Sequence, residues 1–327
     1  MKKIIFIIFF FIFCFTISFN VAASDDIFVI PGGESIGLKI ETGVEIVGKY
    51  SVQTSSGKKN PWANSKIEVG DYIVKVDNYP ISNNEELIKV LKTLNKNNCV
   101  LNIRRNNQNY ETNIDVVKTI SNEPSMGLYV KDKMLGIGTL SFVYNNKFAS
   151  LGHGIYENNE LININKGNIT YSNVLSIKKA TLNQAGEKRA TLLQNSIGTI
   201  SVIKDTGVYG TFNNKVQKDK VKLAEINEVK CDNAVMYTVI NGNSVEKFDV
   251  EIIETKSQSM ISSKGIKVRV TDSTLINETG GIVQGMSGSP IIQNGKLVGI
   301  VSHVTLDNPT IGYAVYAKWM YEELCNY

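Results

Sequence analysis

The 327-residue sequence has only two histidines and four cysteines, so few side chains could bind a transition metal or form disulfides. Neither histidine belongs to an H-E-x-x-H sequence and no two cysteines show C-x-x-C spacing, so a zinc site and a disulfide framework lack support. A G-x-x-x-x-G-K-[ST] phosphate-binding loop is also absent. The net charge is +4 without a dense run of lysine or arginine, which gives no electrostatic footprint for nucleic acid. We therefore expect no metal, no cofactor and no nucleic-acid partner.

Long apolar runs are equally scarce, and the single one lies at the N-terminus. Residues 4–19 are mostly isoleucine and phenylalanine, with Lys2 and Lys3 before them and Val21-Ala22-Ala23 after them. A positive start, an apolar run and then small residues are typical of a secretory signal peptide. The run is shorter than the roughly 20 residues of a membrane-spanning helix. We predict a signal sequence at residues 1–24, with a retained membrane anchor as the alternative, and export of the rest of the chain.

Residues 26–118 are predicted to form a small α+β module with one helix. The segment Ser82-Asn83-Asn84-Glu85 matches a capping box, which places the start of this helix. Apolar residues then recur at helical spacing, which predicts a stripe that packs against a sheet. The stripe consists of Leu87, Val90, Leu91 and Leu94. The polar segment 54–61 is rich in turn residues, so we expect an exposed loop that proteases can cleave.

Residues 124–327 are predicted to form a second module that is mostly β. Short runs of β-branched and aromatic residues alternate with glycine, asparagine and aspartate, at a spacing typical of barrels and sandwiches. A terminal helix within residues 313–327 is the expected exception. No internal repeat of the length used by solenoids and propellers occurs, which excludes those architectures.

The most informative motif is Gly285-Met286-Ser287-Gly288-Ser289-Pro290, a serine framed by glycines ahead of a short apolar strand. Chymotrypsin-like proteases present their nucleophile in this way. The glycines allow a tight turn that exposes the hydroxyl of Ser287 and directs the backbone N–H groups of Gly285 and Ser287 toward one point, the oxyanion hole. A structural loop without chemistry is the alternative that the motif alone leaves open.

A serine nucleophile needs a base, normally an imidazole held by a third group. His153 lies between two glycines that permit close approach of another segment, so it is the predicted base, whereas His303 is predicted to be structural. A strand is predicted at residues 265–270, and Asp272 is the next residue on its apolar face, which makes it the predicted carboxylate partner. A simple turn at Asp272 is the alternative. The competing carboxylates are Asp205, Asp232 and Asp249.

The first module resembles a PDZ domain. The resemblance rests on Ser35-Ile36-Gly37-Leu38, on Val69-Gly70-Asp71-Tyr72-Ile73 and on the single amphipathic helix, which occur in the order of that family. It implies that a peptide adds as a strand beside Ile36, Gly37 and Leu38, and that N–H groups near Gly37 bind a terminal carboxylate. A segment of the chain itself is one ligand that this resemblance leaves open, and an empty spacer is the alternative to any ligand.

The chain as a whole resembles the stage IV sporulation protein B peptidases of endospore-forming bacteria. The features that carry this resemblance are the apolar N-terminus, the PDZ-like module, residues 151–155, Asp272, and the run from Gly280 through the serine motif to Val304. It implies a serine endopeptidase with a chymotrypsin-like barrel domain, with Ser287 as nucleophile, His153 as base and Asp272 as acid partner. Asp272 precedes Ser287 by only 15 positions, so we expect a variant of the chymotrypsin arrangement.

The same resemblance implies a biological role. Members of that family reach the space between forespore and mother cell, cleave themselves and cleave a regulatory membrane protein, which activates a late mother-cell sigma factor. Two other readings stay open. One is a non-catalytic envelope PDZ adaptor with a protease-like binding domain. The other is a quality-control protease, which would carry its protease module before its PDZ module, the reverse of the order here.

Overall fold

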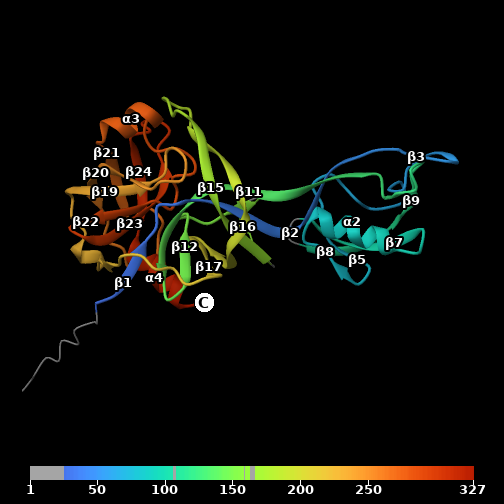
Figure 1. The fold of residues 1–327 in the computed structure, drawn as a ribbon, viewed down its shortest axis with the longest axis horizontal. Helices are drawn as coiled ribbons and strands as arrows, with labels where there is room; N and C mark the ends of the chain where they lie inside the picture. The colour runs from blue at the N-terminus through green and yellow to red at the C-terminus, as the bar shows by residue number, and fades with distance from the viewer. Residues whose placement is uncertain (1–25, 106–107, 158, 163–165) are drawn as a thin grey trace, which may run out of the picture.

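The computed structural model describes residues 26–105, 108–157, 159–162 and 166–327. The predicted signal sequence or anchor at residues 1–24 lies outside this part of the chain. In the described residues, no helix has both the length and the hydropathy needed to cross a membrane. The described chain forms a large and a small lobe, which are joined by the long strands β2 (Ser35–Lys49) and β11 (Leu128–Tyr144) (Figure 1).

The large lobe contains a first closed ring of strands. The first part of β2 pairs with β11 on one edge and with β15 (Lys166–Lys178) on the other. From β15 the ring continues to β16 (Glu187–Lys204), β17 (Gly207–Phe212), β12 (Lys147–Ser150) and back to β11. Every strand therefore has both edges paired, and apolar side chains such as Phe148 and Ile169 fill the interior.

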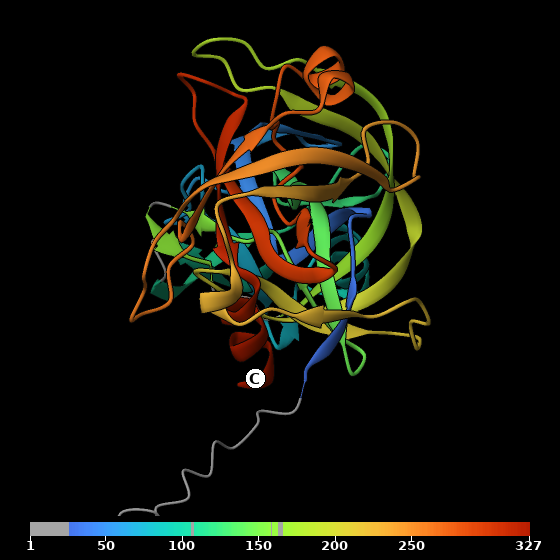
Figure 2. The ribbon, with the colours of Figure 1, turned by 90° about the vertical axis from the view of Figure 1, so that its left-hand side faces the viewer.

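A second ring lies beside the first (Figures 1 and 2). Its members in ring order are β19 (Asn233–Thr238), β20 (Glu246–Thr255), β21 (Ile266–Val270), β24 (Ile311–Tyr316), β23 (Lys296–Val304) and β22 (Pro290–Gln293), which pairs back with β19. Two adjacent closed barrels of antiparallel strands confirm the predicted mostly-β, chymotrypsin-like architecture.

The two barrels are held together by short connecting elements and a helix. Strand β1 (Phe28–Pro31) pairs with β11 of the first barrel and with β18 (Val221–Leu223), which in turn pairs with β23 of the second. Helix α4 (Ala317–Cys325) buries Met320 and Leu324 in a cluster with side chains from both barrels. The predicted terminal helix is thus present, although it begins only after β24.

The small lobe contains the predicted helix and a sheet. Helix α2 (Asn84–Thr93) packs against β5 (Tyr72–Val76), β7 (Asn98–Arg105) and β8 (Gln108–Asp115) through a shared apolar cluster. Asn83 caps α2 by accepting the N–H of Glu86, whose carboxylate reaches back to the N–H of Ser82. The helix is therefore capped one residue later than the sequence suggested, and the Glu86 carboxylate binds the N–H of the residue before the N-cap rather than that of Asn83.

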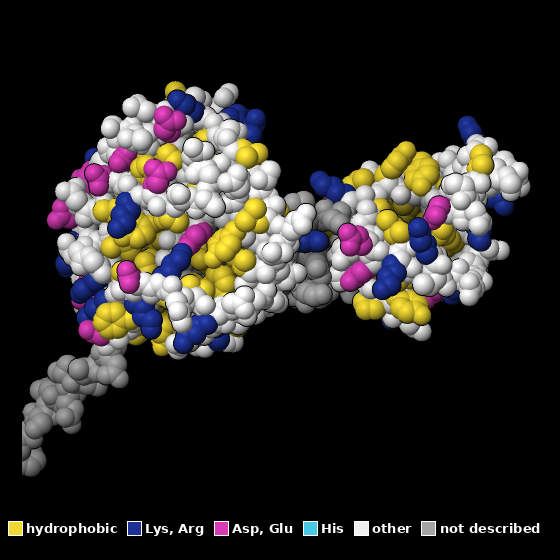
Figure 3. All heavy atoms as spheres, viewed as in Figure 1, with side chains coloured by type: hydrophobic (Ala, Val, Ile, Leu, Met, Phe, Trp, Pro, Cys, Tyr) yellow, Lys and Arg dark blue, Asp and Glu magenta, His cyan; other side chains and the backbone are white. Residues whose placement is uncertain are grey.

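The remaining strands of the small lobe are short. They are β3 (Val52–Thr54), β4 (Gly57–Lys59), β6 (Tyr79–Pro80), β9 (Val117–Lys118) and β10 (Pro124–Ser125). The hairpin of β3 and β4 projects from the end of this lobe that lies farthest from the barrels (Figure 1). On the face shown in Figure 3, lysine and arginine are interspersed with aspartate and glutamate over both lobes, so that face presents no field of one sign.

The structure corrects the predicted peptide-binding residues. Ile36, Gly37 and Leu38 pair with β11 on one edge and with β15 on the other, so no edge is left for an added peptide strand. Ile36 and Leu38 are buried in the core of the first barrel. Residues 26–40, which the sequence assigned to the first module, therefore belong to the barrels, and β2 enters the small lobe only at Val44.

Candidate active site

The predicted nucleophile lies in a glycine turn between helix α3 (Ser273–Thr279) and β22. Gly288 adopts a φ of 99°, and a Cβ there would lie 2.0 Å from the carbonyl oxygen of Thr139, so only glycine fits. The N–H of Gly288 donates to the carbonyl of Val301 in β23. Met286 is fully buried in the second barrel, which fixes one end of the turn and leaves Ser287 part-exposed.

Thr139 of β11 ties this turn to the first barrel. Its N–H donates to the carbonyl of Ser287 at 2.9 Å, and its hydroxyl donates to the carbonyl of Gly285 at 2.7 Å. The serine therefore sits where the two barrels meet. The sequence gives no signal for this role, because the partners of Thr139 are backbone groups far along the chain. Gly285, for example, is 146 residues away.

Two backbone N–H groups beside the serine have no acceptor. Within the described residues, the N–H groups of Gly285 and Ser287 donate to no protein atom, while those of Met286, Gly288 and Ser289 all do. Gly285 has a φ of 94°, which an L-residue with a side chain rarely adopts. Two free donors on alternate residues of a tight turn are what an oxyanion hole requires.

The predicted base lies in a loop that packs against β23. Leu151 and Gly152 both have left-handed backbone, with φ values of 74° and 69°, and a Cβ on Gly152 would lie 2.6 Å from the carbonyl oxygen of Val301. For leucine this conformation costs about 1–2 kcal/mol. Its side chain is buried in the first barrel, which helps to hold the loop in place. The loop delivers His153 to the same junction of barrels as Ser287.

The ring of His153 has a defined orientation. Its Nδ1 lies 2.8 Å from the carbonyl oxygen of Gly154. Because a carbonyl only accepts, this contact assigns the proton to Nδ1 and leaves Nε2 with a free lone pair. Burial lowers the pKa of His153 below its usual value, so the ring is neutral at pH 7. A neutral imidazole with a free Nε2 is the form that can accept a proton from a serine hydroxyl.

In the described part of the chain, no hydrogen bond joins the hydroxyl of Ser287 to His153. The hydroxyl donates to the carbonyl of Ser302 at 3.3 Å, a long and weak hydrogen bond. Hydrogen bonds between catalytic groups often form or tighten only when substrate binds. The hydroxyl is held only weakly and can rotate toward an acceptor that substrate binding brings near.

His303 packs beside His153, which the sequence did not predict. The two ring centroids are 5.4 Å apart with an angle of 46° between the planes. The Nδ1 of His303 is buried without a partner in the described part of the chain. Burial, followed by the charges of His153 and Lys264, lowers the pKa of His303 to about 4. His303 is thus an uncharged side chain that packs against His153 at the site.

The structure places Asp272 at the start of α3. Its Oδ1 accepts the N–H of Leu275 at 2.9 Å, and its own N–H donates to the carbonyl of Asp249. Among the described residues no contact joins Asp272 to His153. The carboxylate has the role of a helix N-cap, so the predicted pairing of Asp272 with His153 has no support from contacts, and the carbonyl of Gly154 orients the imidazole instead.

Of the competing aspartates, only Asp205 contacts the loop of His153. Its carbonyl accepts the N–H of Gly154 at 2.8 Å, while its carboxylate accepts the hydroxyl of Tyr156. Asp232 accepts the N–H of its neighbour Asn233. None of these carboxylates binds the imidazole in the described structure.

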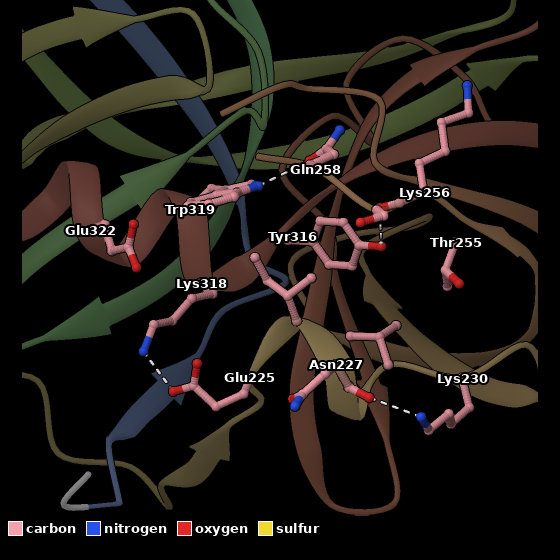
Figure 4. Close-up of a pocket in the computed structure, with 13 residues that line it drawn as sticks. Glu225, Asn227, Lys230, Thr255, Lys256, Gln258, Tyr316, Lys318, Trp319 and Glu322 are labelled. Atoms are coloured by element: carbon pink, nitrogen blue, oxygen red, sulfur yellow. Dashed lines mark hydrogen bonds and ion pairs between the residues drawn. The ribbon is translucent and has the colours of Figure 1, made fainter. Parts of the chain in front are cut away.

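A pocket of about 650 Å³ lies elsewhere, beside α4 (Figure 4). Its polar groups are largely paired with one another. Lys318 forms an ion pair with Glu225, and the indole N–H of Trp319 donates to Gln258. None of its lining residues belongs to the serine turn or to the histidine loop, so this pocket has no part in the chemistry described above.

Comparison with known proteins agrees with this geometry. The model of the SpoIVB peptidase S55 family matches residues 122–321, which is more than half of the chain. No curated protein matches significantly. Among solved structures, the active form of the Rv3671c protease from M. tuberculosis aligns at 15% identity and a TM-score of 0.33, over 59% of this chain and 74% of that one. The HtrA-type protease AlgW, solved with a decapeptide, aligns at 11% identity and a TM-score of 0.34, over 61% and 53%. These structural scores are low, so the assignment rests on the family match.

Proposed function

The chain belongs to the SpoIVB peptidase S55 family and is a serine endopeptidase, and from this premise we propose that it is a signalling protease of sporulation. In this proposal it acts after export, in the space between forespore and mother cell, and it cleaves a membrane-bound regulator. That cleavage activates a late mother-cell sigma factor. The predicted export segment at residues 1–24 and the family support this role.

The proposed reaction uses Ser287 and His153. The Nε2 of His153 takes the proton of the Ser287 hydroxyl as the oxygen attacks a peptide carbonyl, and the N–H groups of Gly285 and Ser287 stabilise the resulting oxyanion. The histidine then gives the proton to the leaving amine, and water hydrolyses the acyl-enzyme with the same base. Loss of one oxyanion donor typically lowers the rate about 10²–10³-fold.

One observation carries the proposal most directly. Two chain segments about 130 residues apart, the glycine turn and the histidine loop, both pack on β23 at Val301, which brings a serine, a neutral imidazole and two free N–H donors to one junction. A binding adaptor would have no need for a pair of unused donors beside a serine.

The signalling role can be tested in sporulating cells. The chromosomal copy is replaced by the Ser287→Ala variant, and a reporter of the late mother-cell sigma factor is measured. Ser289→Ala is the matched control, because the Ser289 hydroxyl is buried without a partner in the described structure. We expect a silent reporter with Ser287→Ala and normal activity with Ser289→Ala. Normal activity in both would refute the signalling role.

We also propose self-cleavage within residues 54–61. In the structure these residues form the end of β3, β4 and the turn that follows it, and most of them are exposed, whereas Thr54 and Pro61 are buried. The hairpin projects away from the barrels, so one molecule would cleave another rather than itself (Figure 1). A peptide-binding role for the small lobe, which the PDZ resemblance implies, remains a proposal, and it cannot use Ile36, Gly37 or Leu38.

A further inference from the structure

The tip of the β15–β16 hairpin docks against the loop that carries the two free N–H groups. The N–H of Ala180 donates to the carbonyl of Thr279, and the N–H of Gln284 donates to the carbonyl of Gly186. The N–H of Lys188 donates back to the carbonyl of Gln284 at 2.9 Å. The hairpin rises beside α3 in Figure 1. A segment of the first barrel thus holds the residue that immediately precedes Gly285.

Lys188 continues this contact with its side chain. A Cβ built on Gly285 would lie 3.1 to 3.2 Å from three carbons of the Lys188 stem, so the stem lies directly against this glycine. The amino group reaches Thr238 of β19 and donates to its hydroxyl at 2.9 Å. Lys188 is 5% exposed and Thr238 is fully buried. One side chain therefore links a strand of the second barrel to the loop of the oxyanion hole.

Burial of a lysine costs free energy, because its amino group loses its contact with water. In the described part of the chain Lys188 forms no ion pair, and Thr238 is the partner of its amino group. Burial lowers the pKa of Lys188 to about 7. A methionine or leucine could cover Gly285 without the cost of desolvating an amine. The amino group must therefore contribute something that packing alone does not.

We propose that Lys188 is a positioning residue for the oxyanion hole, which holds the Gly285 N–H in its productive direction. The stem blocks rotation of the Gly285 peptide on one side, and the bond to Thr238 keeps the stem extended. The backbone N–H of Lys188 donates to the carbonyl of Gln284, which belongs to the same peptide unit as the Gly285 N–H, and Thr139 holds the following peptide unit through the Gly285 carbonyl. This inference rests on the proposed reaction, because only an oxyanion gives the orientation of that N–H a function.

The test compares Lys188→Met with the wild-type enzyme. Methionine keeps most of the stem and removes the amino group. The assay uses a fluorogenic peptide, first selected from a library with the wild-type protein, and a peptide aldehyde whose serine adduct places an oxyanion in the hole. We expect kcat to fall at least tenfold with KM changed less than twofold, and the aldehyde to bind weaker by a similar factor. Thermal stability should stay equal or rise, because a buried amine is removed.

Two further variants keep the test decisive. Thr238→Val removes the acceptor and should lower kcat in the same direction, which covers the case that Lys188→Met does not fold. Lys178→Met removes an exposed lysine of the same hairpin and should change nothing. Wild-type kcat and aldehyde affinity in Lys188→Met would overturn the inference, as would a loss of thermal stability alone.

The same experiment separates this inference from its premise. Wild-type and Ser287→Ala proteins are assayed first. Absence of hydrolysis that depends on Ser287 would refute the proposed reaction and with it the role of Lys188. Hydrolysis by the wild type together with equal hydrolysis by Lys188→Met would refute only the role of Lys188.

Discussion

Replacing Asp272 by asparagine and by alanine separates a structural role from a catalytic one. In the structure the carboxylate caps α3, a helix of seven residues, by accepting the N–H of Leu275. Asparagine keeps an oxygen acceptor and caps about as well as aspartate, so Asp272→Asn should leave stability nearly unchanged. Alanine removes the acceptor and should cost about 1 kcal/mol. For a domain of roughly 150–250 residues this lowers Tm by about 2–4 °C.

The catalytic expectation differs by orders of magnitude. If Asp272 oriented the imidazole, its change to asparagine would lower kcat about 10⁴-fold. From the observed contacts we expect kcat to fall less than threefold in Asp272→Asn, measured on the fluorogenic peptide. The matched control is Asn83→Ala, which removes the N-cap of α2 in the other lobe and should cost similar stability without loss of activity. A 10³-fold or greater loss of kcat in Asp272→Asn would refute this reasoning.

Three other predictions follow from the geometry of the site. Gly288→Ala places a Cβ against the carbonyl of Thr139, at a φ of 99°. Left-handed backbone alone costs about 1–2 kcal/mol, so the unfolding free energy measured in urea should fall by more than this, and hydrolysis should be lost. A stable, active variant would contradict the packing. The pKa of His303 is lowered to about 4, so protonation favours the unfolded chain, and stability should fall as the pH drops from about 6.5 toward 4. His303→Gln should reduce that slope in chemical denaturation series, and an unchanged slope would show that His303 is not buried as a neutral group. Cleavage within residues 54–61 should occur between molecules, so wild-type enzyme should cleave added Ser287→Ala protein, with a rate that rises with concentration; a rate independent of concentration would contradict it.

Much of this fold could be predicted from local sequence patterns. The short β-branched runs and turn residues of positions 124–327 predicted a mostly-β module, and the serine motif predicted a tight glycine turn ahead of a short apolar strand. The helix at residues 84–93 also followed from its cap and its apolar stripe. Each of these signals depends on residues close together in sequence, which is why pattern reading found them.

Two of the errors depend on distant partners, and the third, at Asp272, on a short helix that the sequence analysis did not identify. Ile36 to Leu38 looked like a binding loop, but their two neighbouring strands lie about 100 and 130 residues further along the chain. Strand alternation did not place His303 beside His153, and β23 carries a register shift between Val301 and His303 that interrupts alternation. Asp272 emerged from a strand as predicted, but the helix that it caps begins at the next residue.

The role of Lys188 had no sequence signal at all. It follows a glutamate and precedes an arginine, in a stretch that reads as an exposed strand. Only the folded hairpin places its stem on Gly285 and its amino group on Thr238. A lone lysine in a polar segment is normally solvated, and burial is a property of the tertiary fold.

A covalent probe can show whether Ser287 is a nucleophile that His153 activates. Purified residues 25–327 are treated with a peptidyl phosphonate, and the modified residue is located by mass spectrometry. We predict one phosphonate on Ser287 in the wild type and in Ser289→Ala, and none in Ser287→Ala or His153→Ala. An unmodified wild type, or equal modification of Ser287→Ala, would show that Ser287 is not an activated nucleophile.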